Sequence, residues 1–269
     1  MPRAVHLAAP ALLALAFGAC STLTPDPPAP YTPNPLGPGL RISQVQNPAS
    51  PDYAPNTDVD VSSVVVSWID TYDETKDGKS VGTVYIQDVG SELPFSGLSL
   101  YEASYVPADI RLLPGDVMDI AGMYAESSSV GSATFPAPET LPQFDKPVAT
   151  FRYDFSSPTP TVVPLSDLDE HLDLSNYETG RKWENMLVTV NDVIIAGGET
   201  DTTGLRVSYL MGSGDGGAID LNACAISNEL YPLGKTDYPA GTHFSSVTGI
   251  VTWFYSYQIA PRSAADLVQ

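Results

Sequence analysis

The chain has 269 residues and a formal net charge of -20, from 32 acidic against 12 basic residues. Because nucleic-acid binding draws on Lys and Arg to neutralise phosphates, this balance argues against a nucleic-acid partner and favours cationic or neutral ones. The hydrophobic content of 43% is enough for a buried core, and the length fits one large all-β domain or two small ones. Two cysteines, Cys20 and Cys224, are too few for a disulfide framework.

The first twenty residues have the layout of a secretory signal peptide. A short start with one basic residue leads into an apolar run at 6–17, and Gly18 and Ala19 place small side chains directly before Cys20. The apolar run is too short to span a bilayer permanently. We therefore predict that residues 1–19 are a signal peptide and do not belong to the fold.

The end of this segment resembles a bacterial lipobox, in which the cysteine is lipidated and becomes the first residue of the mature chain. The resemblance implies acylation of Cys20, with palmitate among the lipids, and attachment to a membrane. Phe17 stands where a lipobox usually has Leu, so ordinary signal cleavage is the alternative. A buried helix with Cys20 in the core is a further alternative, but the run 8–17 has no polar face. Ser21 follows the cysteine, which in Gram-negative bacteria implies delivery to the outer membrane.

Residues 21–38 carry seven prolines. Proline removes backbone donors and favours the extended polyproline conformation, at about 3.1 Å per residue. We predict that residues 20–38, the lipidated cysteine and its proline-rich linker, hold a folded part away from the membrane surface.

From residue 39 onward, β-branched and aromatic residues alternate with polar ones, and turn residues separate the runs, which predicts strands. In chain order the expected strands lie at 40–45, 59–69, 81–89, 97–101, 112–125, 183–195, 205–211, 218–226 and 238–258. The two halves show weak, ordered internal similarity. We predict an all-β fold with two five-stranded modules in tandem, at 39–155 and 175–269, joined by a connector at 156–174 with an acidic helical turn at 166–171.

Several motifs in these runs point to a family. The first half has VDVSSVVVSWID, YIQD and GDVMDIAG, and the second has GTHFSSVTGIVTW and the closing YQIAPRS at 257–263. Together, over residues 40–267, they resemble the OB-fold-like domains of secreted and surface bacterial proteins, including the N-terminal part of some extracellular nucleases. The resemblance implies partly open barrels whose loops and one strand face bind ligands. Family members often carry catalysis in a separate downstream domain, and we expect no nuclease domain in this chain.

The sequence offers no arrangement of catalytic residues, so we predict that the protein is not an enzyme. The two histidines beyond the leader, His171 and His243, are far apart and form no metal-binding pattern, and motifs for a nucleophile elbow or a phosphate loop are missing. We expect a solvated His171 and a structural His243. Cys224 has apolar neighbours, which predicts a buried free thiol.

Calcium is the one cofactor for which the sequence offers a weak site, and no other is expected. Asp70, Asp73 and Asp77 lie in or beside DETKDG, which matches the first half of a calcium-binding loop, but Val84 stands where a bidentate Glu belongs. A polar hairpin loop with Asp-Gly turn chemistry is the favoured interpretation.

Three residues of the family motifs have structural interpretations. We expect Asp88 and Asp116 to fix turns by accepting backbone hydrogen bonds. Arg262, with five donors in a fixed fork, is expected to bond carbonyls or to pair with an acid of the barrel.

The best candidate binding face is the aromatic stripe near the C-terminus. Alternation places Trp253, Tyr255 and Tyr257 on one side of a strand. OB-folds stack bases or sugars on such aromatics, although packing inside the barrel explains the same pattern. Because Lys and Arg are few, we rank a carbohydrate or protein ligand above nucleic acid.

These observations predict a non-enzymatic, lipid-anchored protein of the cell envelope that acts as a binding or structural module. The alternative is an accessory subunit that binds substrate, polysaccharide or nucleic acid, for a secreted hydrolase or nuclease.

Overall fold

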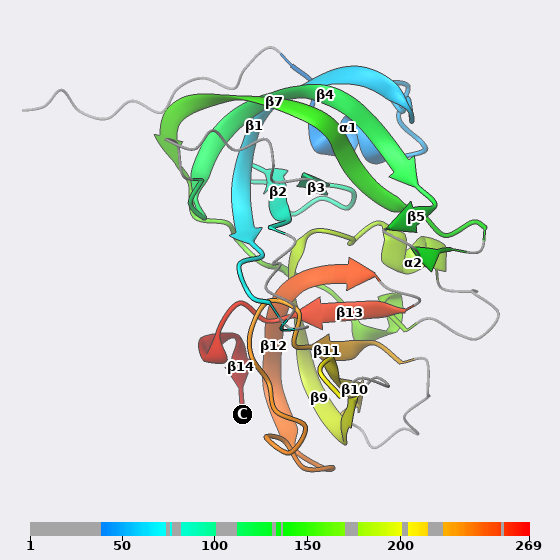
Figure 1. Cartoon of the computed structure of the whole chain (residues 1–269), viewed down its shortest axis with the longest axis vertical. Coiled ribbons are helices and arrows are strands. Elements are labelled where there is room, and N and C mark those ends of the chain that lie inside the picture. The colour runs from blue at the N-terminus through cyan, green and yellow to red at the C-terminus, as the bar shows by residue number, and fades with distance from the viewer. Residues whose placement is uncertain are drawn as a thin grey trace, which may run out of the picture. The chain divides into compact units, whose positions relative to one another are not determined.

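The first module is a closed barrel of five strands (Figure 1). The computed structural model describes residues 39–73, 76, 82–100, 112–130, 133–135, 137–169, 177–200, 204–214, 223–253 and 256–269. The barrel consists of β1 (Thr57–Ile69), β2 (Val84–Asp88), β3 (Gly97–Leu100), β4 (Asp116–Ser127) and β7 (Leu141–Phe155). The strands pair in the order β1-β2-β3-β7-β4, and β4 pairs again with β1 to close the ring. A small hairpin, β5 (Ser129–Val130) and β6 (Ala133–Thr134), lies between β4 and β7.

Alternation along the long strands builds the core of this barrel. In β1, Asp58 and Asp60 are exposed, whereas Val61 is buried and Val59 is half-buried. Side chains that alternate in this way lie on opposite faces of a sheet. The side chains on the inner face of each strand therefore fill the interior of the barrel. The buried residues of this core are Ile42, Val45, Val61, Val64, Val66, Val84, Ile86, Leu98, Leu100, Leu112, Met118, Ile120, Tyr124 and Phe144.

The second module repeats the same strand order with β9 (Leu187–Thr200), β10 (Val207–Ser213), β11 (Ala225–Ser227), β12 (His243–Trp253) and β13 (Tyr257–Ala260). Since β9 pairs with both β10 and β12, these five strands also form a ring. In each ring the third and fifth strands in chain order, β3 with β7 and β11 with β13, pair in parallel. All other neighbouring strands of the rings pair antiparallel. Two short strands, β8 (Thr161–Val162) and β14 (Leu267–Val268), pair with β9 and β12 outside the ring.

Two five-stranded rings of this order are the architecture of the OB-fold, a small, partly open Greek-key barrel. The prediction of an all-β fold with two OB-fold-like modules in tandem is confirmed. All described residues belong to one compact unit, Pro35–Gln269.

The predicted strand at 40–45 is wrong, because the structure has a short helix there, α1 (Ile42–Gln46). The Asp88 carboxylate accepts hydrogen bonds from the backbone N–H groups of Ile42 at 2.8 Å and Ser43 at 3.0 Å, and thereby caps the helix. Arg41 lies 3.5 Å from the same carboxylate. Burial raises the pKa of Asp88, and this effect outweighs the opposing effects of Arg41 and the N–H donors. Asp88 is therefore a helix cap rather than a turn residue.

The role predicted for Asp116 is confirmed. Its carboxylate accepts a hydrogen bond from the Leu113 N–H at 2.8 Å and closes the turn that leads into β4. Gly115 in this turn has a φ of 102°, a left-handed conformation that glycine adopts without steric cost.

The segment between the modules adds to the second sheet. It contains β8 and one turn of 3₁₀ helix, η2 (Leu165–Asp167), in the region of the predicted acidic turn at 166–171, of which residues 170–171 lie outside the described residues. A second short helix, α2 (Tyr177–Arg181), precedes β9, and η3 (Ala264–Asp266) precedes β14.

We predict that Asp88→Ala destabilises the protein, because two backbone donors of α1, the buried Ile42 N–H and the part-buried Ser43 N–H, then lose their acceptor. The free energy of unfolding should fall by about 2–3 kcal/mol, as measured by urea denaturation. The matched control is Asp58→Ala, which removes an exposed carboxylate from β1 and should change stability by no more than about 0.5 kcal/mol. Equal stability of the two variants would contradict the capping role.

Candidate functional site

The face that OB-folds commonly use for ligands is covered in the first module. Such folds bind ligands on the face of their second and third strands and on adjacent loops. Here Tyr85 and Gln87 of β2 lie opposite Ser99 and Gly97 of β3, and only 4% of Tyr85 and 2% of Gln87 is exposed. Gln87 accepts a hydrogen bond from the Leu187 N–H of the second module at 3.1 Å. The second module therefore occupies this face.

The main chain of the second module approaches this face closely. A Cβ at Gly97 would lie 2.5 Å from backbone atoms of Asn185 and Met186, so only glycine fits there without a shift. The Phe95 N–H donates to the Lys182 carbonyl at 2.6 Å. Around these contacts, Tyr85 packs with Leu187, Leu230, Ile250 and Ala260 of the second module, and Trp68 lies against this cluster.

A buried cation joins the two modules beside this face. Arg181, at the end of α2, is 5% exposed and donates to Gln46 at 3.1 Å and to the Tyr124 hydroxyl at 3.1 Å. Its guanidinium also pairs with Glu126 of β4 at 2.8 Å. Burial alone would lower the pKa of Arg181, but Tyr124, Glu184 and Glu126 raise it above its usual value. The guanidinium is therefore charged at neutral pH.

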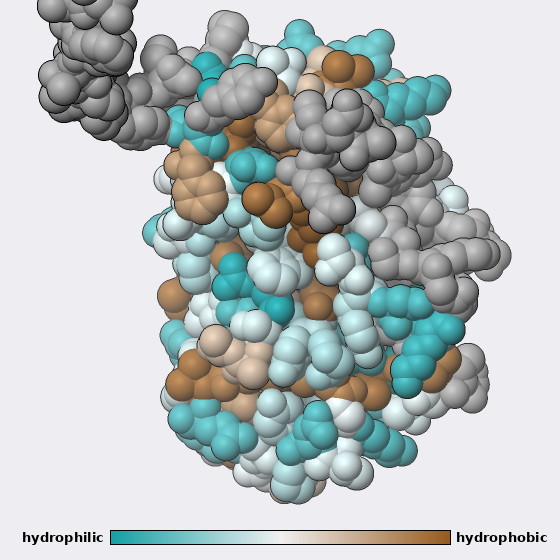
Figure 2. Space-filling model, turned by 60° about the vertical axis from the view of Figure 1, so that its left-hand side comes forward, coloured by the Kyte–Doolittle hydropathy of each residue, from teal (hydrophilic) through white to brown (hydrophobic). Residues whose placement is uncertain are grey.

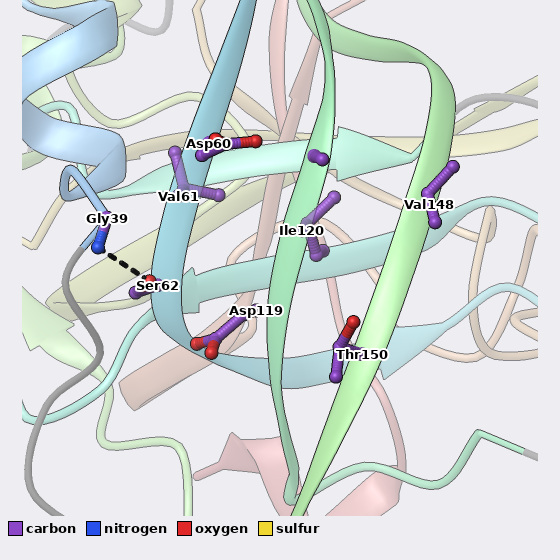
Figure 3. A pocket seen from close by; sticks show the side chains of 9 residues that line it. Gly39, Asp60, Val61, Ser62, Asp119, Ile120, Val148 and Thr150 are labelled. Atoms are coloured by element: carbon purple, nitrogen blue, oxygen red, sulfur yellow. Dashed lines mark hydrogen bonds between the residues drawn. The ribbon is translucent and has the colours of Figure 1, made fainter.

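A second face of the first module is open. The outer side of β1, β4 and β7 carries a groove of about 330 Å³, which Figure 3 shows from close by. Asp60 of β1 and Val148 of β7 border it, with β4 between these two strands. Ala121 of β4 lines it together with a neighbouring groove of about 340 Å³, which shares Asp60 and Val148 and is also lined by Asp58 and Gly122.

Of the acidic residues that line these two grooves, one has a cationic partner among the described residues and two do not. Asp119 accepts a hydrogen bond from the Ser63 N–H at 2.9 Å and pairs with Arg152 at 3.1 Å. Asp58 and Asp60 are exposed, and neither carboxylate makes an ion pair or hydrogen bond to a described residue. Uncompensated negative charge is thus concentrated along β1.

The predicted aromatic binding face is corrected for the two residues that the structure describes. Trp253 and Tyr257 are buried in the core of the second module. The Trp253 ring packs edge-on against Phe135, with centroids 4.5 Å apart, and the Tyr257 hydroxyl donates to the Tyr177 carbonyl at 2.7 Å. These side chains stabilise the core and are not available to a ligand. Tyr255 lies outside the described residues.

The predicted calcium site is only partly described. Asp70 is buried and accepts a hydrogen bond from the Tyr72 N–H at 3.2 Å, which is turn chemistry, and Asp77 lies outside the described residues. Within the described ranges, no group of three or more His, Cys, Asp or Glu side chains could hold a metal ion. Calcium binding stays a prediction.

Other predicted residues have structural roles. Arg262 pairs with an acid, Asp266 at 2.8 Å, but this acid lies in η3 and not in a barrel strand, and the guanidinium lies over the Trp68 ring. Cys224 is a buried free thiol, as predicted, and burial raises its pKa. His243 pairs with Asp192 at 2.6 Å on the surface of the second module.

Cys20 and His171 lie outside the described residues. In the part of the chain that the structure covers, no helix has the length and apolar character needed to cross a membrane.

No protein-family model matches the chain, and no match was found among curated proteins or solved structures. The strand order and the contacts described above therefore carry the interpretation of its function.

Sequence reasoning missed both the open groove and Arg181. The TDVDV run at 57–61 contains the signal for the first, because alternation places Asp58 and Asp60 on the outer face. Arg181 has no such signal, since its partners come from two other elements distant in the sequence.

We predict strong coupling between Arg181 and Glu126. Arg181→Met leaves carboxylates near the module interface without their cation and should lower the free energy of unfolding by about 3–5 kcal/mol. Adding Glu126→Gln removes one of those carboxylates, so the double variant should be more stable than the sum of the single effects predicts. A double-mutant cycle by urea denaturation measures this coupling. Additive effects would contradict a shared buried network.

Proposed function

We propose that the protein is a non-enzymatic, lipid-anchored binding module of the cell envelope. Cys20 is the anchor, and the prolines of residues 21–38 separate the folded modules from the membrane. In a Gram-negative cell, Ser21 after the cysteine directs such a lipoprotein to the outer membrane.

The observation that carries the binding function is the arrangement of the first module's two faces. The second module covers its β2–β3 face through contacts at Gln87, at Gly97 and in the cluster around Tyr85. The opposite face, formed by β1, β4 and β7, is grooved and carries two carboxylates, Asp58 and Asp60, that pair with no described residue. This geometry favours the second module as a support that stiffens the first, with the β1–β4–β7 face as the surface for a partner.

The chemistry of the surface favours a protein ligand. Of the aromatic stripe predicted to stack on a sugar, the described residues Trp253 and Tyr257 are buried, and the net charge of -20 disfavours nucleic acid. The OB-fold topology supports the alternative, an accessory subunit that binds substrate for a secreted hydrolase or nuclease. Oligonucleotide binding at low salt that weakens steeply as salt rises would favour that alternative over our proposal.

The anchor is tested by metabolic labelling of the full chain with a palmitate analogue. We expect labelling to be lost in Cys20→Ala, because the acylated thiol is removed. The matched control is Cys224→Ala, which removes the other cysteine and should leave labelling unchanged, since that thiol is buried. Labelling that persists in Cys20→Ala would remove the anchor from the proposal.

A further inference from the structure

We propose that the outer face of β1, β4 and β7 docks an extended protein segment with Lys or Arg at alternate positions. The proposal rests on the binding function proposed above and names the class of partner. It starts from the groove that Asp60, Ala121 and Val148 border (Figure 3).

Charge complementarity is the first argument for this partner. Asp58 and Asp60 are exposed and have no ionic partner among the described residues. The third acid of the groove, Asp119, is already paired with Arg152. Among the described residues, the one cation that lines either groove is Lys146 of β7, in the neighbouring groove, and it makes no ion pair with Asp58 or Asp60. A cationic partner can therefore supply the ion pairs that Asp58 and Asp60 do not make with any described residue.

The spacing of the two carboxylates is the second argument. Residues two apart in a strand point to the same face and lie about 6.6 Å apart, at about 3.3 Å per residue. A partner in extended conformation repeats its side chains at the same interval. Two of its alternate cations can therefore face Asp58 and Asp60 together.

The apolar residues of the groove can pack against the aliphatic part of the partner's Lys and Arg side chains. Val148 is 60% exposed and lies opposite the exposed Ala121 across the β4–β7 ladder. Lys and Arg lay their methylene groups on apolar surface while the charged end reaches a polar group. On the face of the molecule in Figure 2, hydrophobic side chains lie in patches among hydrophilic ones.

At β4, side chains rather than backbone carry the contact. β4 pairs with β1 along one edge and with β7 along the other. A partner consequently cannot add to β4 as a further strand, and its specificity comes from charge and spacing.

The test uses fluorescence anisotropy with the full chain and two synthetic peptides. In one peptide Lys and Thr alternate, and in the other the same residues are sorted into a Lys block and a Thr block. We expect the alternating peptide to bind more tightly and its binding to weaken as salt rises, because exposed ion pairs are screened. Equal affinity for both peptides would overturn the proposal, since bulk charge attraction alone would then explain binding.

Two pairs of variants locate the site. Asp58→Asn with Asp60→Asn should weaken binding of the alternating peptide by roughly threefold or more. The control, Glu92→Gln with Glu199→Gln, changes the net charge equally at exposed positions outside the groove and should have little effect.

The second pair adds a cation at an exposed valine. Val148→Lys should weaken binding, whereas Val162→Lys, at a side chain 66% exposed on β8, should not. Equal effects within either pair would overturn the proposal. Palmitate labelling at Cys20 is independent of these peptides, so failure of this inference and failure of the anchor are distinguishable.

Discussion

The buried guanidinium of Arg181 is the interaction on which the arrangement of the two modules depends. A charge removed from water is tolerated only when opposite charge and hydrogen-bond acceptors surround it. Those groups, Gln46, Tyr124 and Glu126, all belong to the first module, while Arg181 belongs to the helix that leads into the second. If the modules separated, the carboxylate and the guanidinium would each lose this partner. The network therefore specifies one way for the modules to pack.

This packing decides which surface is left for a partner. The main chain at residues 185–187 lies on the β2–β3 face much as a peptide ligand would, with a hydrogen bond to Gln87 and a close approach to Gly97. Because its own neighbour covers this face, the partner that we propose would contact another surface of the first module. The long strands β1, β4 and β7 supply the other face, and the bulge of β1 near Ser63, fixed by Asp119 and bonded to Arg152, shapes one end of it.

The fold was largely predictable because it depends on local pattern. Alternation and turn residues located most strands, and the repeated order of motifs indicated two modules. The segment at 40–45 also alternates, yet it forms a helix because Asp88, 46 residues from Ile42, caps it. Alternation likewise placed Trp253 and Tyr257 on one face without indicating that Phe135 and Tyr177 bury them. A pattern in one segment shows which residues share a face, whereas the contacts of that face come from distant segments.

The most direct test of this account measures the distance between spin labels at Glu92→Cys and Glu199→Cys, in a chain that also carries Cys20→Ala and Cys224→Ala. Both label positions are exposed, one in the first module and one in the second. Pulsed electron paramagnetic resonance should give a single narrow distance distribution, because the Arg181 network and the contacts at Gly97 hold the modules in one arrangement. A broad or multiple distribution would mean that the modules move relative to one another, and would contradict the claim that the second module seals the β2–β3 face.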